Sequence, residues 1–214
     1  MTRADLFLQT KFTFQSGQDH RLPYDPSAPI EEQVQQSLES SLEHLGVDYV
    51  DSYVLHGPSR GTGLDSNDWG AWHAMEGLQD AGVTKLLGIS NVSLEQLKLL
   101  VDKARIPPAF VQNRCYAIQR WGQDVRAFCN ARGIIYQAFS LLTANAKFLS
   151  HPTLLGIAEN HQRNAAQVVF RYAIDSGMVP LTGTSQKEHM LDDLSALEFR
   201  LSPVEREAIE NIAT

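Results

Sequence analysis

Polar side chains stand at the carboxyl ends of several short apolar runs, and two of them can do proton chemistry. Lys11 ends one run and His56 ends the next. A nearby cation lowers the pKa of its neighbours, and an imidazole can orient or polarise a carbonyl oxygen. A lysine and a histidine at neighbouring strand ends can therefore bias a proton transfer. The alternative is that His56 is a hydrogen-bonded structural residue at a strand end.

Further strand ends carry groups suited to binding. Ser90, Asn91 and Gln112 offer hydroxyl and carboxamide groups that can hold an amide-bearing ligand. Thr184 and Ser185 precede a helical pattern whose first N–H groups suit a phosphate. Each signal has a plain alternative, because the same residue types cap turns and begin ordinary helices.

The sequence contains seven histidines and two cysteines, Cys115 and Cys129, without a metal-binding pattern. No HExxH motif is present, and no cysteine pair has zinc spacing. GxSxG and P-loop motifs are also absent. We therefore expect no metal site, and the two cysteines do not form a disulfide framework.

Short β-rich runs alternate with helical patterns along the whole chain. The expected strands are 6–12, 50–56, 84–90, 110–116, 133–140 and 178–182. The expected helices are 30–45, a segment around 72–78, 93–104, 124–132, 164–176, and two more that begin at capping boxes at 185–188 and 202–205. This order predicts parallel strands joined by right-handed crossovers.

Such alternation suits an open sheet or a closed barrel. An open nucleotide-binding sheet has a glycine-rich turn after its first strand, and no GxGxxG occurs here. Polar residues at nearly every strand end are typical of the catalytic face of a (β/α)8 TIM barrel. The predicted fold class is therefore α/β, of the (β/α)8 barrel type, with about six βα units present.

Length and composition set the remaining limits. The 214 residues suit a single domain over residues 1–214. The net charge of −7 disfavours nucleic acid, and no apolar stretch approaches the ~18 residues that span a bilayer. The beginning of the chain has no secretory cleavage pattern. We expect a cytoplasmic protein without a nucleic-acid or membrane partner.

Taken in order, these segments resemble the aldo-keto reductase superfamily of NAD(P)H-dependent barrel oxidoreductases. LFLQTKF is similar to the family's third strand, and the resemblance makes Lys11 its catalytic lysine. LEHLGVDYVDSYVLHGP is similar to the fourth strand and makes His56 its catalytic histidine. LLGISN and FVQNRCY resemble the strands whose ends hold the nicotinamide carboxamide, here Ser90, Asn91 and Gln112.

The resemblance continues to the end of the chain and implies the rest of a cofactor site. In IIYQAFSLL, Phe139 corresponds to the aromatic residue that stacks on the nicotinamide, and Ser140 and Leu141 begin the pyrophosphate loop. VPLTGTSQKEHMLDDL is similar to the eighth strand and the adenosine-phosphate helix. This helix adds the expected cofactor residues Thr184, Ser185, His189 and Asp193.

The chain departs from the family in two respects. It begins at about the family's third strand, so we expect an N-terminal truncation that removes the family's Asp and its proton-donating Tyr. Tyr24, in the loop after Lys11, could replace that Tyr only through a coincidence of reach and orientation. Gly183 and His189 replace the Lys and Arg that surround a 2′-phosphate. The resemblance implies NADP(H) as cofactor, with NAD(H) as the alternative.

Three functions remain open. The first is an NAD(P)H-dependent reductase of small aldehydes or ketones, which the missing Asp and Tyr would leave inactive or incomplete. The second is a non-catalytic NADP(H)-binding or regulatory partner protein. The third is an inert remnant that self-associates through exposed barrel edges, because six strands cannot close as eight do.

Overall fold

The computed structural model describes residues 2–213 as alternating parallel strands and helices. The hydrogen-bonded strand order follows the chain order, from β1 to β6. This arrangement confirms the predicted α/β class. The residues group into two compact units, Met1–Val111 and Gln112–Thr214. The division falls within one strand, β4. The prediction of a single domain over the whole chain stays a prediction.

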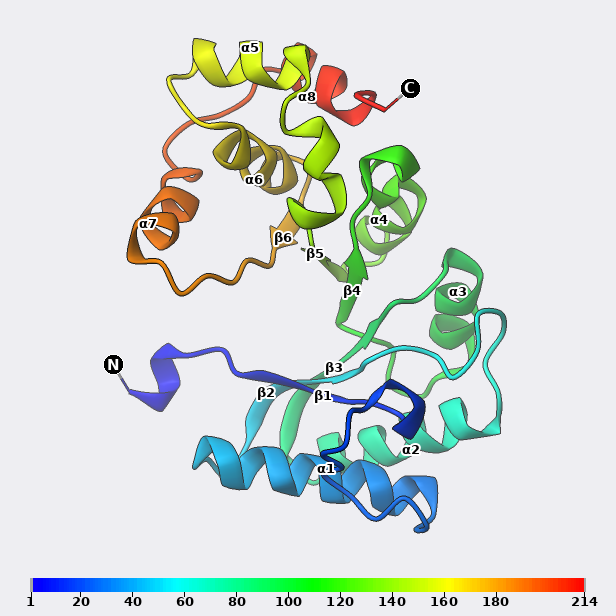
Figure 1. Cartoon of the computed structure of the whole chain (residues 1–214). Coiled ribbons are helices and arrows are strands. Elements are labelled where there is room, and N and C mark those ends of the chain that lie inside the picture. Colours follow the sequence, from blue (N-terminus) through cyan, green and yellow to red (C-terminus); the bar gives the residue numbers. More distant parts are fainter. Residues whose placement is uncertain (1, 214) are drawn as a thin grey trace. The chain divides into compact units, whose positions relative to one another are not determined.

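The first unit is a parallel sheet with helices packed against it (Figure 1). Strand β2 lies between β1 and β3, and its side chains are all buried. The elements of this unit are the 3₁₀ turns η1 (Arg3–Asp5) and η2 (Gln15–Gly17), the strands β1 (Gln9–Phe12), β2 (Val50–Leu55), β3 (Thr84–Ser90) and the start of β4 (Phe110–Arg114), and the helices α1 (Ile30–Leu45), α2 (Ser66–Asp80) and α3 (Leu94–Lys103).

Helix α1 forms where an apolar stripe meets a glycine stop. Val34 and Leu38 of this stripe are fully buried, and Glu31 and Glu32 favour the positive end of the helix dipole. Gly46 ends the helix in the left-handed conformation, with φ +63°. The expected range of 30–45 is therefore confirmed.

Asp51 anchors the amino end of β2 to two neighbouring segments. Its carboxylate accepts the backbone N–H of Leu8 at 2.9 Å and pairs with Arg3 at 2.8 Å and Lys85 at 3.0 Å. Burial alone would raise the pKa of Asp51, but these hydrogen bonds and cations outweigh it and lower the pKa to about 2. The charge of Asp51 therefore fixes the chain segment that leads into β1.

The second unit packs helices around the end of β4 and the parallel pair β5 and β6 (Figure 1). Trp121 is its central side chain: its indole Nε1–H donates to the Ile209 carbonyl at 2.9 Å, and its ring lies 5.2 Å from that of Tyr172. The elements are the 3₁₀ segments η3 (Ala117–Gly122) and η4 (Thr143–Phe148), the strands β5 (Ile135–Phe139) and β6 (Met178–Pro180), and the helices α4 (Gln123–Asn130), α5 (Pro152–Asn160), α6 (Ala165–Asp175), α7 (Lys187–Ser195) and α8 (Pro203–Glu210).

Both cysteines are free and fully buried in this unit. The Cys115 thiol donates to the Trp121 carbonyl at 3.4 Å. Burial raises the pKa of each thiol to about 12. Neither thiol is therefore ionised near neutral pH.

Several expected boundaries were wrong by a few residues. β1 begins at Gln9 rather than at residue 6, and β4 ends at Arg114 rather than at residue 116. β2, β5 and β6 end before His56, Ser140 and Thr182, which belong to the loops that follow these strands. Helix α5 was not expected. The capping box at 185–188 was wrong: α7 begins at Lys187, and the Thr184 hydroxyl accepts the Gln186 N–H at 3.1 Å. The capping boxes at Ser93 and Ser202 are confirmed.

No described helix is long and apolar enough to cross a bilayer.

Candidate active site

Lys11 lies in β1, and His56 directly follows the neighbouring strand β2. Lys11 is in register with Val54, and His56 follows Val54 by two residues, so the three side chains point the same way. Partial desolvation and the nearby Lys11 cation lower the pKa of His56, and desolvation lowers the pKa of Lys11. The imidazole is therefore neutral at pH 7 and can donate a hydrogen bond to a carbonyl oxygen.

Asn91 fixes the segment that carries this histidine. Its side-chain Nδ2 donates to the His56 carbonyl at 2.8 Å, and its backbone is left-handed, with φ +50°. Asn tolerates this conformation better than most residues. Ser90, the preceding residue, is buried at the end of β3. The ends of β2 and β3 are thereby joined by a side-chain hydrogen bond.

A small pocket of about 200 Å³ opens beside His56. The loop after β1 forms one wall with Thr13 and Gly17, and Asn91 lies on the opposite strand end. A methyl group on Gly17 would stand 3.9 Å from the His56 Nδ1 atom, so this loop lies against the imidazole. The pocket has room for a small molecule next to the histidine.

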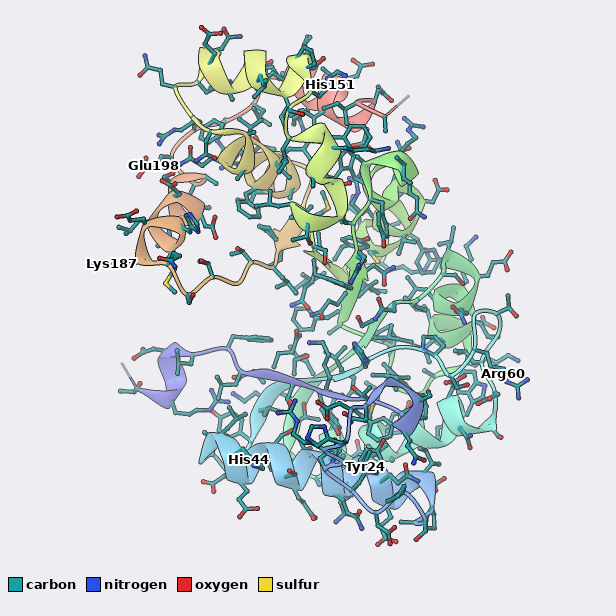
Figure 2. All side chains as sticks on the ribbon, viewed as in Figure 1. Tyr24, His44, Arg60, His151, Lys187 and Glu198 are labelled. Atoms are coloured by element: carbon teal, nitrogen blue, oxygen red, sulfur yellow. The ribbon has the colours of Figure 1, made fainter. Side chains whose placement is uncertain are left out.

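Tyr24 does not take part in this pocket. Its ring packs against Phe12, its hydroxyl donates to the Thr13 carbonyl at 2.8 Å, and burial raises its pKa. Figure 2 labels this side chain near α1. Tyr24 is therefore a packing residue, and the structure gives it no proton to offer at His56.

In the second unit, β4 carries Gln112. Its amide Nε2 donates to the Gln137 Oε1 atom of β5 at 2.9 Å, and both side chains are buried. Arg114 lies two residues further along the strand, and its guanidinium lies 5.5 Å from the centre of the Phe139 ring. Sequence reasoning missed both Gln137 and Arg114. Strand alternation, which places residues 112 and 114 on one face, was the available signal for Arg114.

The loop after β5 begins with Ser140 and Leu141 and is held by a buried amide. Ser140 has φ +56°, and Leu141 is buried. The Asn145 side chain accepts the Ala117 N–H at 2.7 Å and donates to the carbonyls of Cys115 and Leu141, each at 2.8 Å. Asn145 therefore ties this loop to the chain that follows β4.

The loop leads to a pocket of about 490 Å³, a volume within the ~300–1,000 Å³ range of small-molecule sites. Thr184, His189 and Asp193 line this pocket, whereas Ser185 is exposed and outside the described lining. The Thr184 hydroxyl lies 3.5 Å from the His189 Nδ1 atom. The pocket combines hydroxyl, imidazole and carboxylate groups, and hydrogen-bonding groups of these kinds fit the ribose of a nucleotide.

A family model described as the Aldo/keto reductase family matches residues 1–214. The chain belongs to this family. Members of the family use NADP(H). The expected N-terminal truncation stays a prediction.

Curated relatives resemble this family member over most of its length. An "Aldo-keto reductase" of Mycolicibacterium vanbaalenii is 30% identical, and the alignment covers 98% of this chain and 69% of that protein. "Prostaglandin F synthase 1" of Bos taurus is 29% identical, over 85% of this chain and 64% of that protein. The chain thus spans about two thirds of the length of these curated relatives.

Solved aldo-keto reductase structures match its fold. An aldo/keto reductase from Brucella melitensis has a TM-score of 0.82 and 28% identity, over 99% of this chain and 75% of that one. An aldo-keto reductase complexed with NADPH has a TM-score of 0.81 and 24% identity, over 98% of this chain and 64% of that one. These matches confirm the (β/α)8-barrel fold class.

Proposed function

We propose that this family member binds a nicotinamide dinucleotide and reduces small aldehydes or ketones to alcohols. The observation that carries the proposal is the neutral His56 beside the Lys11 cation at a pocket on the strand ends. Ser90 and Asn91 of the first unit would hold the carboxamide of the cofactor, as the family resemblance implies. The cofactor roles of Gln112 and Phe139 in the second unit stay predictions. When bound, the cofactor supplies the hydride for the reduction.

The protein's own residues orient and polarise the substrate. The His56 N–H donates to the carbonyl oxygen and aligns it in the pocket. The Lys11 ammonium stabilises the negative charge that develops on that oxygen. Desolvation, which lowers the pKa of Lys11, also makes this ammonium a better proton source.

The assay follows oxidation of NADH and NADPH with a generic aldehyde. We expect His56→Gln to lower kcat/KM by about 10²-fold or more, as loss of an acid–base group does. His73→Gln is the matched control, because His73 is an exposed histidine on α2. Equal activity of the two variants, with folding verified by circular dichroism, would contradict the roles proposed here.

A second function is favoured by one observation. In the described part of the first unit, the tyrosine hydroxyls of Tyr24 and Tyr53 donate to backbone carbonyls, and the Tyr49 ring packs against two cations. None of them serves His56 as a proton donor. A non-catalytic NADP(H)-binding or regulatory protein fits this arrangement. Dinucleotide binding without turnover supports this second function, and the absence of binding excludes both.

A further inference from the structure

The pocket of the second unit is acidic. Its described lining includes Asp192 and Asp193 and contains neither lysine nor arginine; His189 is the one side chain there that can become a cation. A carboxylate attracts hydroxyl donors and repels other anions. The lining therefore discriminates between a neutral and an anionic ligand group.

Neutral neighbours orient these carboxylates without cancelling their charge. The Thr182 hydroxyl donates to Asp193 Oδ2 at 2.7 Å. The amides of Asn164 and Gln167 each lie 3.4 Å from an oxygen of Asp192. The hydroxyl and the two amides carry no charge of their own.

The basic residues nearest in sequence, Arg163 and Lys187, lie outside the described pocket lining. Arg163 pairs with Glu198 at 3.0 Å. Lys187 is exposed at the beginning of α7 and lies outside the described pocket lining (Figure 2). A phosphate monoester, which carries about −1.5 to −2 charges at pH 7, would meet two carboxylates here without a paired cation.

We propose that this pocket accepts a ribose whose 2′-hydroxyl is free, so that this chain favours NAD(H) over NADP(H). The inference rests on the proposed function, because it requires that the chain bind a nicotinamide dinucleotide. The ribose 2′- and 3′-hydroxyls donate hydrogen bonds to carboxylate oxygens, with Asp193 already oriented by Thr182. A 2′-phosphate would remove one donor and add repulsion.

Titration of the full chain with NADH and with NADPH, followed by calorimetry, tests this preference without requiring turnover. We expect NADH to bind at least about tenfold more tightly at low salt, a difference of about 1.4 kcal/mol. The ratio should shrink in high salt, because screening weakens the repulsion. Equal or tighter binding of NADPH would overturn the preference and leave the proposed function intact; the absence of binding by either dinucleotide would overturn both.

Two charge-neutralising variants test whether the preference for NADH arises from this pocket. Asp193→Asn should tighten NADPH binding at least about threefold and narrow the ratio of the two affinities. Glu188→Gln removes the same charge from the same helix, outside the described lining, and should leave the ratio unchanged. Equal shifts in both variants would trace the preference to net charge and overturn the assignment to this pocket.

Discussion

Neutralising Asp51 should lower the free energy of unfolding of the protein at pH 7 and change it little near pH 2. Asp51 is buried, and its carboxylate holds Arg3, Lys85 and the Leu8 N–H at 2.8–3.0 Å. Asp51→Asn keeps an oxygen that can accept the Leu8 N–H but removes the charge that both cations face. The variant therefore isolates the electrostatic part of this anchor.

The magnitude follows from the pKa. A carboxyl group at about 2 in the folded chain and 3.8 when unfolded contributes about 2 kcal/mol of stability, at 1.36 kcal/mol per pH unit. Solvent screening reduces this to about 1–2 kcal/mol, because the Lys85 side chain is 55% exposed. The folded pKa is the lower one, so this stability is present above about pH 4 and is lost as the pH falls toward 2.

Urea unfolding at several pH values from 2 to 7 measures this contribution. The free energies of unfolding of wild type and Asp51→Asn should differ by about 1–2 kcal/mol at pH 7 and converge below pH 4. Asp48→Asn is the matched control, because Asp48 is an exposed carboxylate three residues earlier. A difference that does not vary with pH, or one no larger than that of the control, would refute the reasoning.

Three further outcomes are expected. Removing the Lys11 cation by Lys11→Met should raise the pKa of His56, which NMR titration of the imidazole would detect; an unchanged pKa would mean that the cation does not act on it. Gly122→Ala should lower the free energy of unfolding by about 1–3 kcal/mol more than Gly133→Ala: both glycines have φ near +70°, but only at Gly122 would the new methyl group lie 2.6 Å from a tyrosine hydroxyl. Equal urea midpoints would contradict this steric account. Asn145→Ala removes three buried hydrogen bonds and should lower the free energy of unfolding, measured in urea, by about 2–4 kcal/mol. A decrease of less than about 1 kcal/mol would show that water takes over the hydrogen bonds of the amide.

Elements with strong local signals were predictable from the sequence. The boundaries of α1 and β3 agree with those expected, because an apolar stripe with a glycine stop and a short, largely apolar run between turn residues leave few alternatives. The N-cap of α6 at Asn164 is also as expected. Helix α5 was missed because its cap is a histidine, although Pro152 at its first position was an available signal.

Contacts between distant residues were beyond the reach of the sequence patterns. Alternation placed Lys11 and His56 at neighbouring strand ends, but it could not predict that the Asn91 amide would bond to the His56 backbone. The bond between Gln112 and Gln137 depends on the tertiary pairing of β4 with β5. Such contacts arise from the three-dimensional register, which residue spacing along one strand does not encode.

The two buried thiols are a built-in chemical probe for local opening of the second unit. Cys115 and Cys129 are the only cysteines of the chain, and both are inaccessible in the folded state. A thiol-reactive dye can modify them only when the surrounding structure opens and exposes them, because burial keeps them protonated. The labelling rate of the unmodified wild-type protein therefore measures the opening frequency of the unit that contains the acidic pocket, and a bound dinucleotide should slow it.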